Sequence, residues 1–164
     1  TYDEDFHSPF GEAENAIMLD GFSKSHGMLG WRVGYAVGPA EVIHEMTKLQ
    51  QYTYVCAPSF AQKAALHALD HDMSPTVDAY RRKRDMIYDG LKESFDLHKS
   101  GGAFYAFVRA PDDNGTAFVE KAIAHNLLII PGSVFSEKGS HFRISFAADD
   151  ATIARGIEIL TSLV

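Results

Sequence analysis

Apolar residues in the first half of the chain follow a strand pattern and then a helical one. Short apolar runs at 16–19 and 31–37 predict two strands, and the glycine-broken stretch between them predicts a loop. Apolar residues at helical spacing then predict helices at 40–52 and 60–69. The first strand is expected to be buried, and the sequence offers no further strand that would complete a sheet around this pair.

The second half predicts a compact α+β unit. Helical spacing predicts a long helix at 76–94, which bridges the two halves. The elements expected after it are strands at 103–108, 127–130 and 142–146, and helices at 116–125 and from Asp149 onward. In the last helix, one face carries the apolar residues that we expect to point inward, namely Ile153, Ile157, Leu160 and Leu163. This pattern places a domain boundary between residues 1–74 and 75–164.

Composition and charge narrow the class of protein. The 164 residues are 46% hydrophobic and 23% charged, which is ordinary for a globular chain. A net charge of −7 argues against nucleic acid or an anionic membrane surface as the main partner. No apolar run approaches the roughly 18 residues that a membrane span needs. We therefore expect a soluble, cytoplasmic protein, in which the basic run 81–84 forms a solvated helix face.

A single cysteine and a pair of histidines are two further candidate sites. Cys56 is the single cysteine, so an internal disulfide is excluded, and we expect a buried and inert thiol. His67 and His71 stand four residues apart on a predicted helix and could face one another to bind a metal. The sequence places no third ligand beside them, so surface histidines and no metal site are expected.

The stretch GFSKSHGMLGWRVGYAVGP at 21–39 carries the main candidate chemistry. Lys24 follows a predicted buried strand, where α/β folds place ligand sites, and we expect its amine to be partly desolvated. An amine in such a place, near a second cation, is suited to bond covalently with an aldehyde. Arg32 offers a planar bidentate grip on a phosphate, and Ser23 adds a hydroxyl donor. The residues fit a site for pyridoxal phosphate, although a solvated lysine and an arginine paired to an acid would fit them equally well.

This stretch resembles the lysine motif of the class I/II aminotransferases, which are fold-type I pyridoxal-phosphate enzymes. In that family Ser-Lys precedes a glycine-containing loop and Gly-x-Arg-x-Gly-Tyr, which are matched here by Ser23, Lys24, Gly30, Arg32, Gly34 and Tyr35. Further stretches resemble the family in the same order, namely YVCAPSFAQKAALHAL, GGAFYAF, LLIIPGSVF and FRISFA. The resemblance therefore covers the whole chain. It implies an α/β fold of the PLP-transferase type, with a C-terminal remnant of the large cofactor domain at 1–74 and a complete α+β small domain at 75–164.

The resemblance also implies roles for individual residues. The cofactor would be pyridoxal 5′-phosphate, held by Lys24 as a Schiff base and by Ser23 and Arg32 at its phosphate. Lys24 would be the catalytic residue, which moves a proton once it is released from the cofactor. Arg143 would bind the α-carboxylate of the substrate. Tyr105 and its neighbour Phe104 could line the substrate pocket or pack in the core, and the sequence leaves this choice open.

The implied activity is transamination between an amino acid and a 2-oxo acid by a homodimeric parent enzyme. In the family, an Asp and a Tyr upstream of the lysine bind the ring of the cofactor, and both precede the point that matches Thr1. The acids at 3–5 are expected to form an exposed loop and not to replace that Asp. We therefore expect the isolated chain to be inactive and to show weak or no specific labelling by the cofactor. The alternatives are a C–S lyase of the same fold and a non-catalytic folded module.

Overall fold

The computed structural model describes residues 1–8, 10–13 and 15–164, and the chain forms two compact units. The N-terminal unit comprises Phe6–Met73. The C-terminal unit comprises Ser74–Val164 together with the first residues of the chain, Thr1–Asp5. The chain therefore passes from one unit to the other twice. The assignment of 1–74 to a cofactor domain and of 75–164 to a small domain stays a prediction.

The N-terminal unit is built around one antiparallel strand pair. Strands β1 (Met18–Gly21) and β2 (Gly34–Val37) pair in a register that places Gly21 opposite Gly34. Two short helical turns lie between the strands, and two longer helices follow them, namely α1 (Phe22–Ser25), η1 (Leu29–Trp31), α2 (Ala40–Gln51) and α3 (Ser59–Leu69). A small core joins the loop between the strands to α3 through Phe22, Met28, Val33, Ala61 and Ala65.

Two expectations about these strands are wrong. Residues 16–19 were expected to be buried, but Ile17 is 46% exposed and Leu19 is 72% exposed. A strand needs packed neighbours on its faces to be buried, and the described residues of this unit supply a sheet of only two strands. The second strand begins at Gly34 and not at residue 31, because residues 29–31 form a 3₁₀ turn and Arg32 adopts a left-handed conformation.

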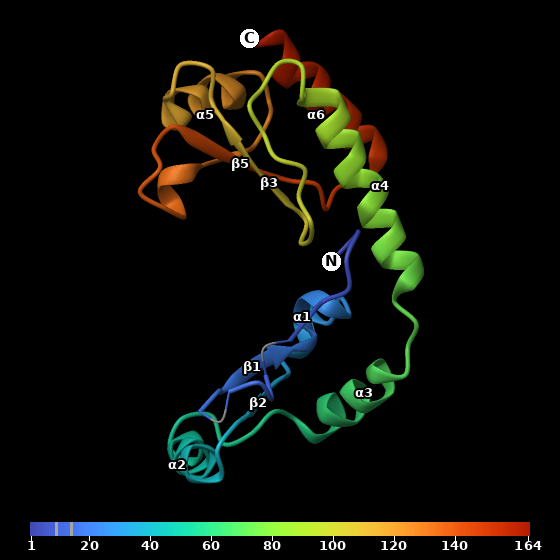
Figure 1. Ribbon diagram of the computed structural model, residues 1–164, viewed down its shortest axis with the longest axis vertical. Helices are drawn as coiled ribbons and strands as arrows, with labels where there is room; N and C mark the ends of the chain where they lie inside the picture. Colours follow the sequence, from blue (N-terminus) through green and yellow to red (C-terminus); the bar gives the residue numbers. More distant parts are fainter. Residues whose placement is uncertain (9, 14) are drawn as a thin grey trace. The chain divides into compact units, whose positions relative to one another are not determined.

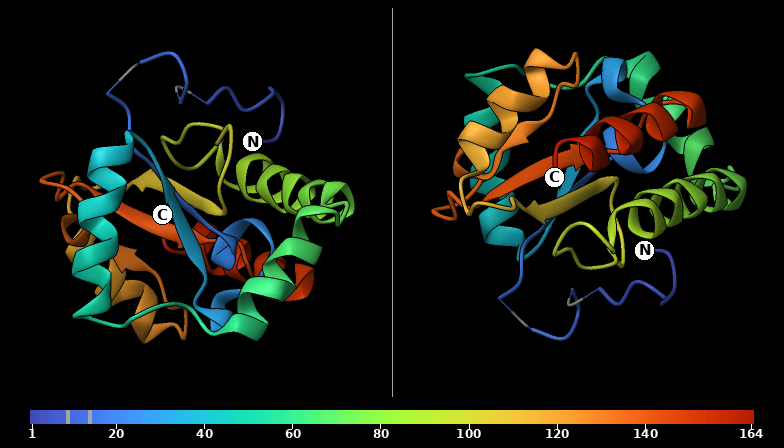
Figure 2. Two further views of the ribbon diagram at one scale, coloured as in Figure 1. Left: turned by 90° about the horizontal axis from the view of Figure 1, so that it is seen from below. Right: turned by 90° about the horizontal axis from the view of Figure 1, so that it is seen from above.

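The C-terminal unit is a three-stranded antiparallel sheet with helices on one face. Strands β3 (Tyr105–Arg109) and β4 (Ile130–Pro131) both pair with β5 (His141–Ser145), which gives the order β3-β5-β4. The helical elements are α4 (Ser74–Leu91), α5 (Gly115–Ala124), η2 (Gly132–Val134) and α6 (Asp150–Ser162). In Figure 1, α5 lies beside β5, and α4 and α6 run alongside one another, as the views of Figure 2 also show.

The alternation of side chains divides this sheet into a buried and an outer face. Ala106 and Val108 on β3, and Phe142 and Ile144 on β5, are buried in the main core. The residues between them point to the opposite face, because successive side chains of a strand alternate. The core face is covered by residues of α4, α5 and α6, including Leu91, Phe118 and Leu160. The outer face carries Tyr105, Phe107, Arg109, His141, Arg143 and Ser145.

The last helix agrees with its sequence pattern. Asp149 caps it, because its carboxylate accepts a hydrogen bond from the backbone N–H of Thr152 at 2.8 Å. Ile153 and Leu160 are buried, and Leu163, at the C-terminal end of the helix, is 7% exposed. The inward face predicted for this helix is therefore confirmed.

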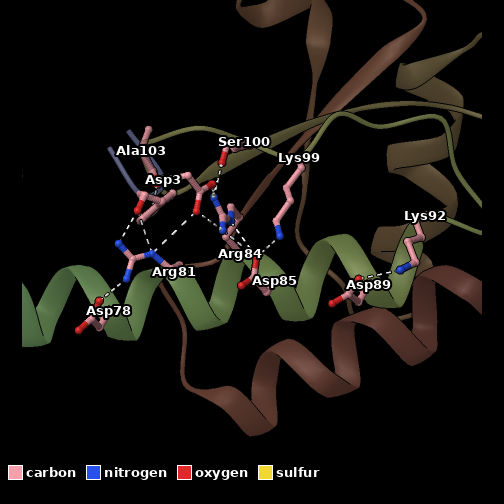
Figure 3. Close-up of polar contacts among 11 residues, drawn as sticks. Asp3, Asp78, Arg81, Arg84, Asp85, Asp89, Lys92, Lys99, Ser100 and Ala103 are labelled. Atoms are coloured by element: carbon pink, nitrogen blue, oxygen red, sulfur yellow. Dashed lines mark hydrogen bonds and ion pairs between the residues drawn. The ribbon is translucent and has the colours of Figure 1, made fainter. Parts of the chain in front are cut away.

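The basic run 81–84 does not form a solvated face, and that prediction is wrong. Arg82 is exposed, but Arg84 is 3% exposed and binds the carboxylates of Asp3 and Asp85 (Figure 3). It also donates to the backbone oxygen of Ser100 at 3.1 Å. The hydrogen bond from Arg84 holds the pKa of Asp3 below its ordinary value. These contacts fix Asp3 to α4.

Aromatic and backbone contacts complete this attachment. The Arg84 guanidinium lies 4.9 Å from the centroid of the Tyr2 ring, and the Tyr2 hydroxyl donates to the backbone oxygen of Ala103. The Tyr2 backbone N–H donates to the Gly101 carbonyl at 2.9 Å, and Arg81 donates to the Tyr2 carbonyl. The first residues of the chain are therefore an integral part of the C-terminal unit.

The described residues contain neither a membrane-spanning helix nor a metal-binding cluster. No helix in the described part of the chain is both long and apolar enough to cross a membrane. Among the same residues, no group of three or more His, Cys, Asp or Glu side chains is arranged to hold a metal ion.

Candidate functional site

Lys24 lies on the short helix α1, directly after strand β1. The strand ends at Gly21, whose N–H donates to the Asp20 carboxylate at 2.7 Å, and the helix starts at Phe22. The buried Phe22 ring anchors this turn, while Lys24 points outward and is exposed. The expectation that Lys24 is partly desolvated is therefore wrong for the described chain, because its neighbouring strand pair is itself open to solvent.

Backbone hydrogen bonds close the loop between the two strands. The N–H of Phe22 donates to the carbonyl of Val33 at 3.3 Å, and the N–H of Met28 donates to the carbonyl of Phe22 at 3.2 Å. Ser23 and Lys24 directly follow Phe22, and Arg32 directly precedes Val33. The closure therefore brings Ser23, Lys24 and Arg32 to the same end of the β1–β2 pair.

Arg32 has an unusual backbone conformation at this end of the pair. Its φ is 53°, in the left-handed region that non-glycine residues adopt uncommonly. Its guanidinium donates to the Leu29 carbonyl at 3.2 Å and the residue is exposed. Such a conformation persists only where the surrounding structure imposes it, and it is frequent at ligand-binding positions. The loop glycine Gly27 also has a positive φ of 65°, as expected for a tight turn.

Close packing of the two strands explains one glycine of the motif. A Cβ atom at Gly34 would lie 2.9 Å from the Asp20 carbonyl oxygen, and real Cβ atoms essentially never come that close to another atom. Gly34 is thus required for the register that closes the loop. By contrast, a Cβ at Gly30 would meet nothing within 4 Å.

Arg143 lies in the other unit, on the outer face of the three-stranded sheet. Strand β5 places it opposite Phe107 of β3 and opposite Ile130 of β4. Its guanidinium carbon is 4.1 Å from the centroid of the Tyr105 ring and 3.9 Å from that of the Phe135 ring. Both distances are in the range of close cation–π contacts.

One hydrogen-bond donor of Arg143 is unsatisfied among the residues that the structure describes. Its Nε atom is buried and has no hydrogen-bond partner among the residues that the structure describes. An unmade hydrogen bond of this kind costs about 1–3 kcal/mol. Such a group calls for an acceptor that the described chain does not supply, and a carboxylate is the acceptor that an arginine pairs with best.

The donor set at the end of the β1–β2 pair fits pyridoxal phosphate. An exposed amine on Lys24 can reach an aldehyde, while the Arg32 guanidinium and the Ser23 hydroxyl are phosphate donors. The structure thus brings together the three residues predicted to hold the cofactor. Arg143 belongs to the other unit.

Two contacts of the structure were not predicted from the sequence, namely that of Arg143 with Phe135 and that of Arg84 with Asp3. The contact of Phe135 with Arg143 joins a turn to a strand, and no local spacing signals it. Arg84 could have been found, because it falls on the same helical face as Tyr80, Ile87 and Leu91.

Cys56 was predicted to be buried and is exposed. It lines a groove of about 590 Å³ with residues of the same unit, including Phe22, Tyr35, Ala65, Leu66 and Leu69.

Comparison with known proteins identifies relatives along nearly the whole chain. Residues 3–160 match the family described as aminotransferase class I and II. A probable aspartate aminotransferase of Methanocaldococcus jannaschii is 35% identical over 99% of this chain. The crystal structure of an aspartate aminotransferase from Thermotoga maritima matches with a TM-score of 0.91 and 30% identity, and it covers 99% of this chain. An aromatic aminotransferase from Pyrococcus horikoshii gives the same TM-score, identity and coverage of this chain.

The share of each relative that is covered is smaller. The chain spans 46% of the M. jannaschii protein, 44% of the T. maritima chain and 47% of the P. horikoshii chain. The chain thus corresponds to somewhat less than half of these proteins, and its fold is that of the matching part. The match to residues 3–160 shows that the chain belongs to the class I and II aminotransferase family.

Proposed function

We propose that this chain supplies the cofactor anchor and the carboxylate-binding arginine of an aminotransferase that moves an amino group between an amino acid and a 2-oxo acid. The observation that carries the proposal is the closed loop that brings Ser23, Lys24 and Arg32 to one end of the β1–β2 pair. In this proposal residues 1–74 belong to the cofactor domain and residues 75–164 form the small domain. The working enzyme is a cytoplasmic homodimer.

The residues at the anchor have separate tasks. Pyridoxal phosphate supplies an electron-withdrawing ring, which stabilises negative charge at the substrate Cα. Lys24 would hold the cofactor aldehyde covalently and, once released from it, its amine would move the proton between the substrate Cα and the cofactor. Arg32 and Ser23 donate hydrogen bonds to the phosphate, which fixes the cofactor against rotation and translation.

Arg143 binds the part of the substrate that amino acids and 2-oxo acids share. Both classes carry a carboxylate on the reacting carbon, so one guanidinium serves both halves of the exchange. The relatives named above are an aspartate and an aromatic aminotransferase, whose names specify different side chains. Recognition of the α-carboxylate is therefore the part of substrate binding that we assign to this chain, and the side-chain preference is left to other residues.

A chimeric enzyme tests the proposal. This chain would replace the matching part of the M. jannaschii relative, to which it is 35% identical. With aspartate and 2-oxoglutarate as substrates, we expect one molecule of glutamate for each molecule of oxaloacetate. Lys24→Ala should abolish the exchange, and Arg143→Lys should raise the KM for both substrates by roughly 10- to 100-fold, as for truncation of one partner of a charged pair.

The reaction products distinguish the proposed transaminase from a C–S lyase of the same fold. A C–S lyase would release ammonia and pyruvate from cysteine without an acceptor acid, and it would leave no aminated cofactor. The transaminase should convert the cofactor to its aminated form in the absence of a 2-oxo acid, and should release no ammonia. Ammonia release that depends on Lys24, without amino transfer, would contradict the proposal.

A further inference from the structure

The outer face of the three-stranded sheet places an aromatic ring beside Arg143. Arg143 on β5 is paired with Phe107 on β3, and Tyr105 is paired with Ser145. Tyr105 is therefore the diagonal neighbour of Arg143 on the same face. Aromatic and long side chains can bridge the distance between two such diagonal positions. The measured 4.1 Å between the Arg143 guanidinium carbon and the Tyr105 ring centroid shows that they do so.

A second ring reaches the guanidinium from the turn before β5. Phe135 follows η2, and its N–H donates to the Gly132 carbonyl at 2.9 Å, which holds it in this turn. A Cβ at Gly132 would lie 2.7 Å from the His141 carbonyl oxygen, so the turn packs tightly against the start of β5. The Phe135 ring centroid is 3.9 Å from the guanidinium carbon of Arg143.

The two rings contact the guanidinium without using its hydrogen bonds. An aromatic face attracts a cation but is a poor acceptor for in-plane N–H groups. This agrees with the buried Nε of Arg143, which lacks a partner among the described residues. Contact with a ring face also restrains the tilt of a planar group, so the direction of its N–H edge becomes fixed.

We propose that Tyr105 and Phe135, called here the aromatic pair, are positioning residues that hold the Arg143 guanidinium in one orientation for a carboxylate. The inference rests on the proposed role of Arg143 as the carboxylate-binding residue. The aromatic pair does not touch the reacting atoms in this proposal. Because the aromatic pair already restricts the Arg143 side chain, less conformational entropy is lost when a planar carboxylate binds in a bidentate manner.

The test follows the Arg143 side chain by NMR in the ¹⁵N-labelled 164-residue chain. The Nε–H signal is assigned by its loss in Arg143→Lys. We expect a ring-current shift of this signal, which moves toward the free-arginine position in Tyr105→Leu and in Phe135→Leu. Tyr105→Phe keeps the ring and should keep the shift. Phe107→Leu is the matched control, because the Phe107 ring stacks on His141 with centroids 4.9 Å apart.

Pyruvate is the carboxylate probe in the same samples. We expect Tyr105→Leu and Phe135→Leu each to weaken pyruvate binding by roughly tenfold, the scale of one cation–π contact. Tyr105→Phe and Phe107→Leu should bind within about twofold of the unchanged chain, a difference smaller than one such contact. Because Phe135 is 47% exposed, its variant also guards against misfolding of the Tyr105 variant.

The outcomes separate this inference from the proposed function. If Arg143→Lys abolishes pyruvate binding while both leucine variants of the aromatic pair bind normally, the positioning role is refuted and the role of Arg143 stands. If Tyr105→Phe loses affinity as Tyr105→Leu does, the hydroxyl and not the ring matters, and the inference fails. If pyruvate binds Arg143→Lys as it binds the unchanged chain, the proposed function of Arg143 fails, and the inference fails with it.

Discussion

Arg84 and Asp3 are 81 positions apart in the sequence, yet both terminal nitrogens of Arg84 bind the Asp3 carboxylate. The Nη2 to Oδ1 distance is 3.2 Å. Arg84 is 3% exposed, whereas the Asp3 side chain is 56% exposed. The pair therefore joins the buried side of α4 to the first residues of the chain at the edge of the C-terminal unit (Figure 3).

Removal of the Arg84 guanidinium should destabilise the C-terminal unit. Arg84→Met keeps the apolar stem but loses the bonds to Asp3, to Asp85 and to the Ser100 carbonyl. We expect the free energy of unfolding of this unit to fall by about 1–3 kcal/mol, as for hydrogen bonds to charged groups. Urea unfolding followed by amide exchange in β3 and β5 measures this. Arg82→Met on the same helix is the control, because Arg82 is exposed; equal effects of the two variants would contradict the prediction.

The same cluster should make the C-terminal unit sensitive to acid. Hydrogen bonding from Arg84 lowers the pKa of Asp3, and hydrogen bonding from Lys99, followed by that from Arg84, lowers the pKa of Asp85. A carboxyl with a depressed folded-state pKa contributes stability above its unfolded pKa of about 4, and this contribution is lost as the pH falls through the folded-state value. Urea midpoints should therefore decrease below about pH 4. In Asp3→Asn the decrease should be shallower, and an unchanged slope would refute the assignment.

Gly34 should be far less tolerant of alanine than Gly30. Gly34→Ala places a Cβ 2.9 Å from the Asp20 carbonyl oxygen, so the β1–β2 pair must separate locally. We expect a loss of about 1–3 kcal/mol in the stability of the N-terminal unit, the usual cost of overpacking. In Gly30→Ala the added methyl meets nothing within 4 Å, and the stability should stay nearly unchanged. Amide exchange at Val33 and Gly34 reports the difference, and similar protection in both variants would count against the tight strand pairing.

Cys56 should react with thiol reagents in the folded chain. It is exposed, so access does not require unfolding. We expect Ellman's reagent to modify it in native buffer at a rate within a few-fold of the rate in 8 M urea. A thiol that reacts only after denaturant is added would show that Cys56 is covered in solution, for example by association of two chains over its groove.

Local sequence patterns were sufficient to predict the structure where the environment of a residue depends on its neighbours in the sequence. The apolar spacing in the last helix predicted which side chains face inward, because a helix that packs on a sheet presents one face at a period of 3.6 residues. The glycine-broken loop between the two strands was predicted in the same way, and Gly27 in this loop has a positive φ. The grouping of Ser23, Lys24 and Arg32 at one end of the strand pair was predictable because they lie within one loop, whose closure needs only nearby hydrogen bonds.

Local sequence patterns gave wrong predictions where contacts with distant segments determine the environment of a residue. Arg84 was assigned to a solvated face because charged runs are usually solvated, but it is buried, and its partner Asp3 lies 81 positions earlier in the sequence, where no local pattern signals the contact. Lys24 was expected to be desolvated because strands of α/β folds are normally covered on both sides. In the described chain the strand before it belongs to a two-stranded pair with exposed apolar residues such as Leu19.

The most direct consequence of the proposed function is that Lys24 and Arg32 form one binding site for an aldehyde that carries a phosphate. It is tested by mixing the chain with substoichiometric pyridoxal phosphate, reducing with borohydride, and mapping the label by mass spectrometry. Lys48 and Lys63 are internal controls, because both are exposed lysines of the same unit. The sequence alone led us to expect weak or no specific labelling, but the closed loop brings Arg32 to the same end of the strand pair as Lys24. We therefore now expect Lys24 to carry roughly tenfold more label than either control, the scale of one charge-assisted hydrogen bond, and Arg32→Ala to remove this preference. Equal labelling of the three lysines, or a preference that survives Arg32→Ala, would contradict it.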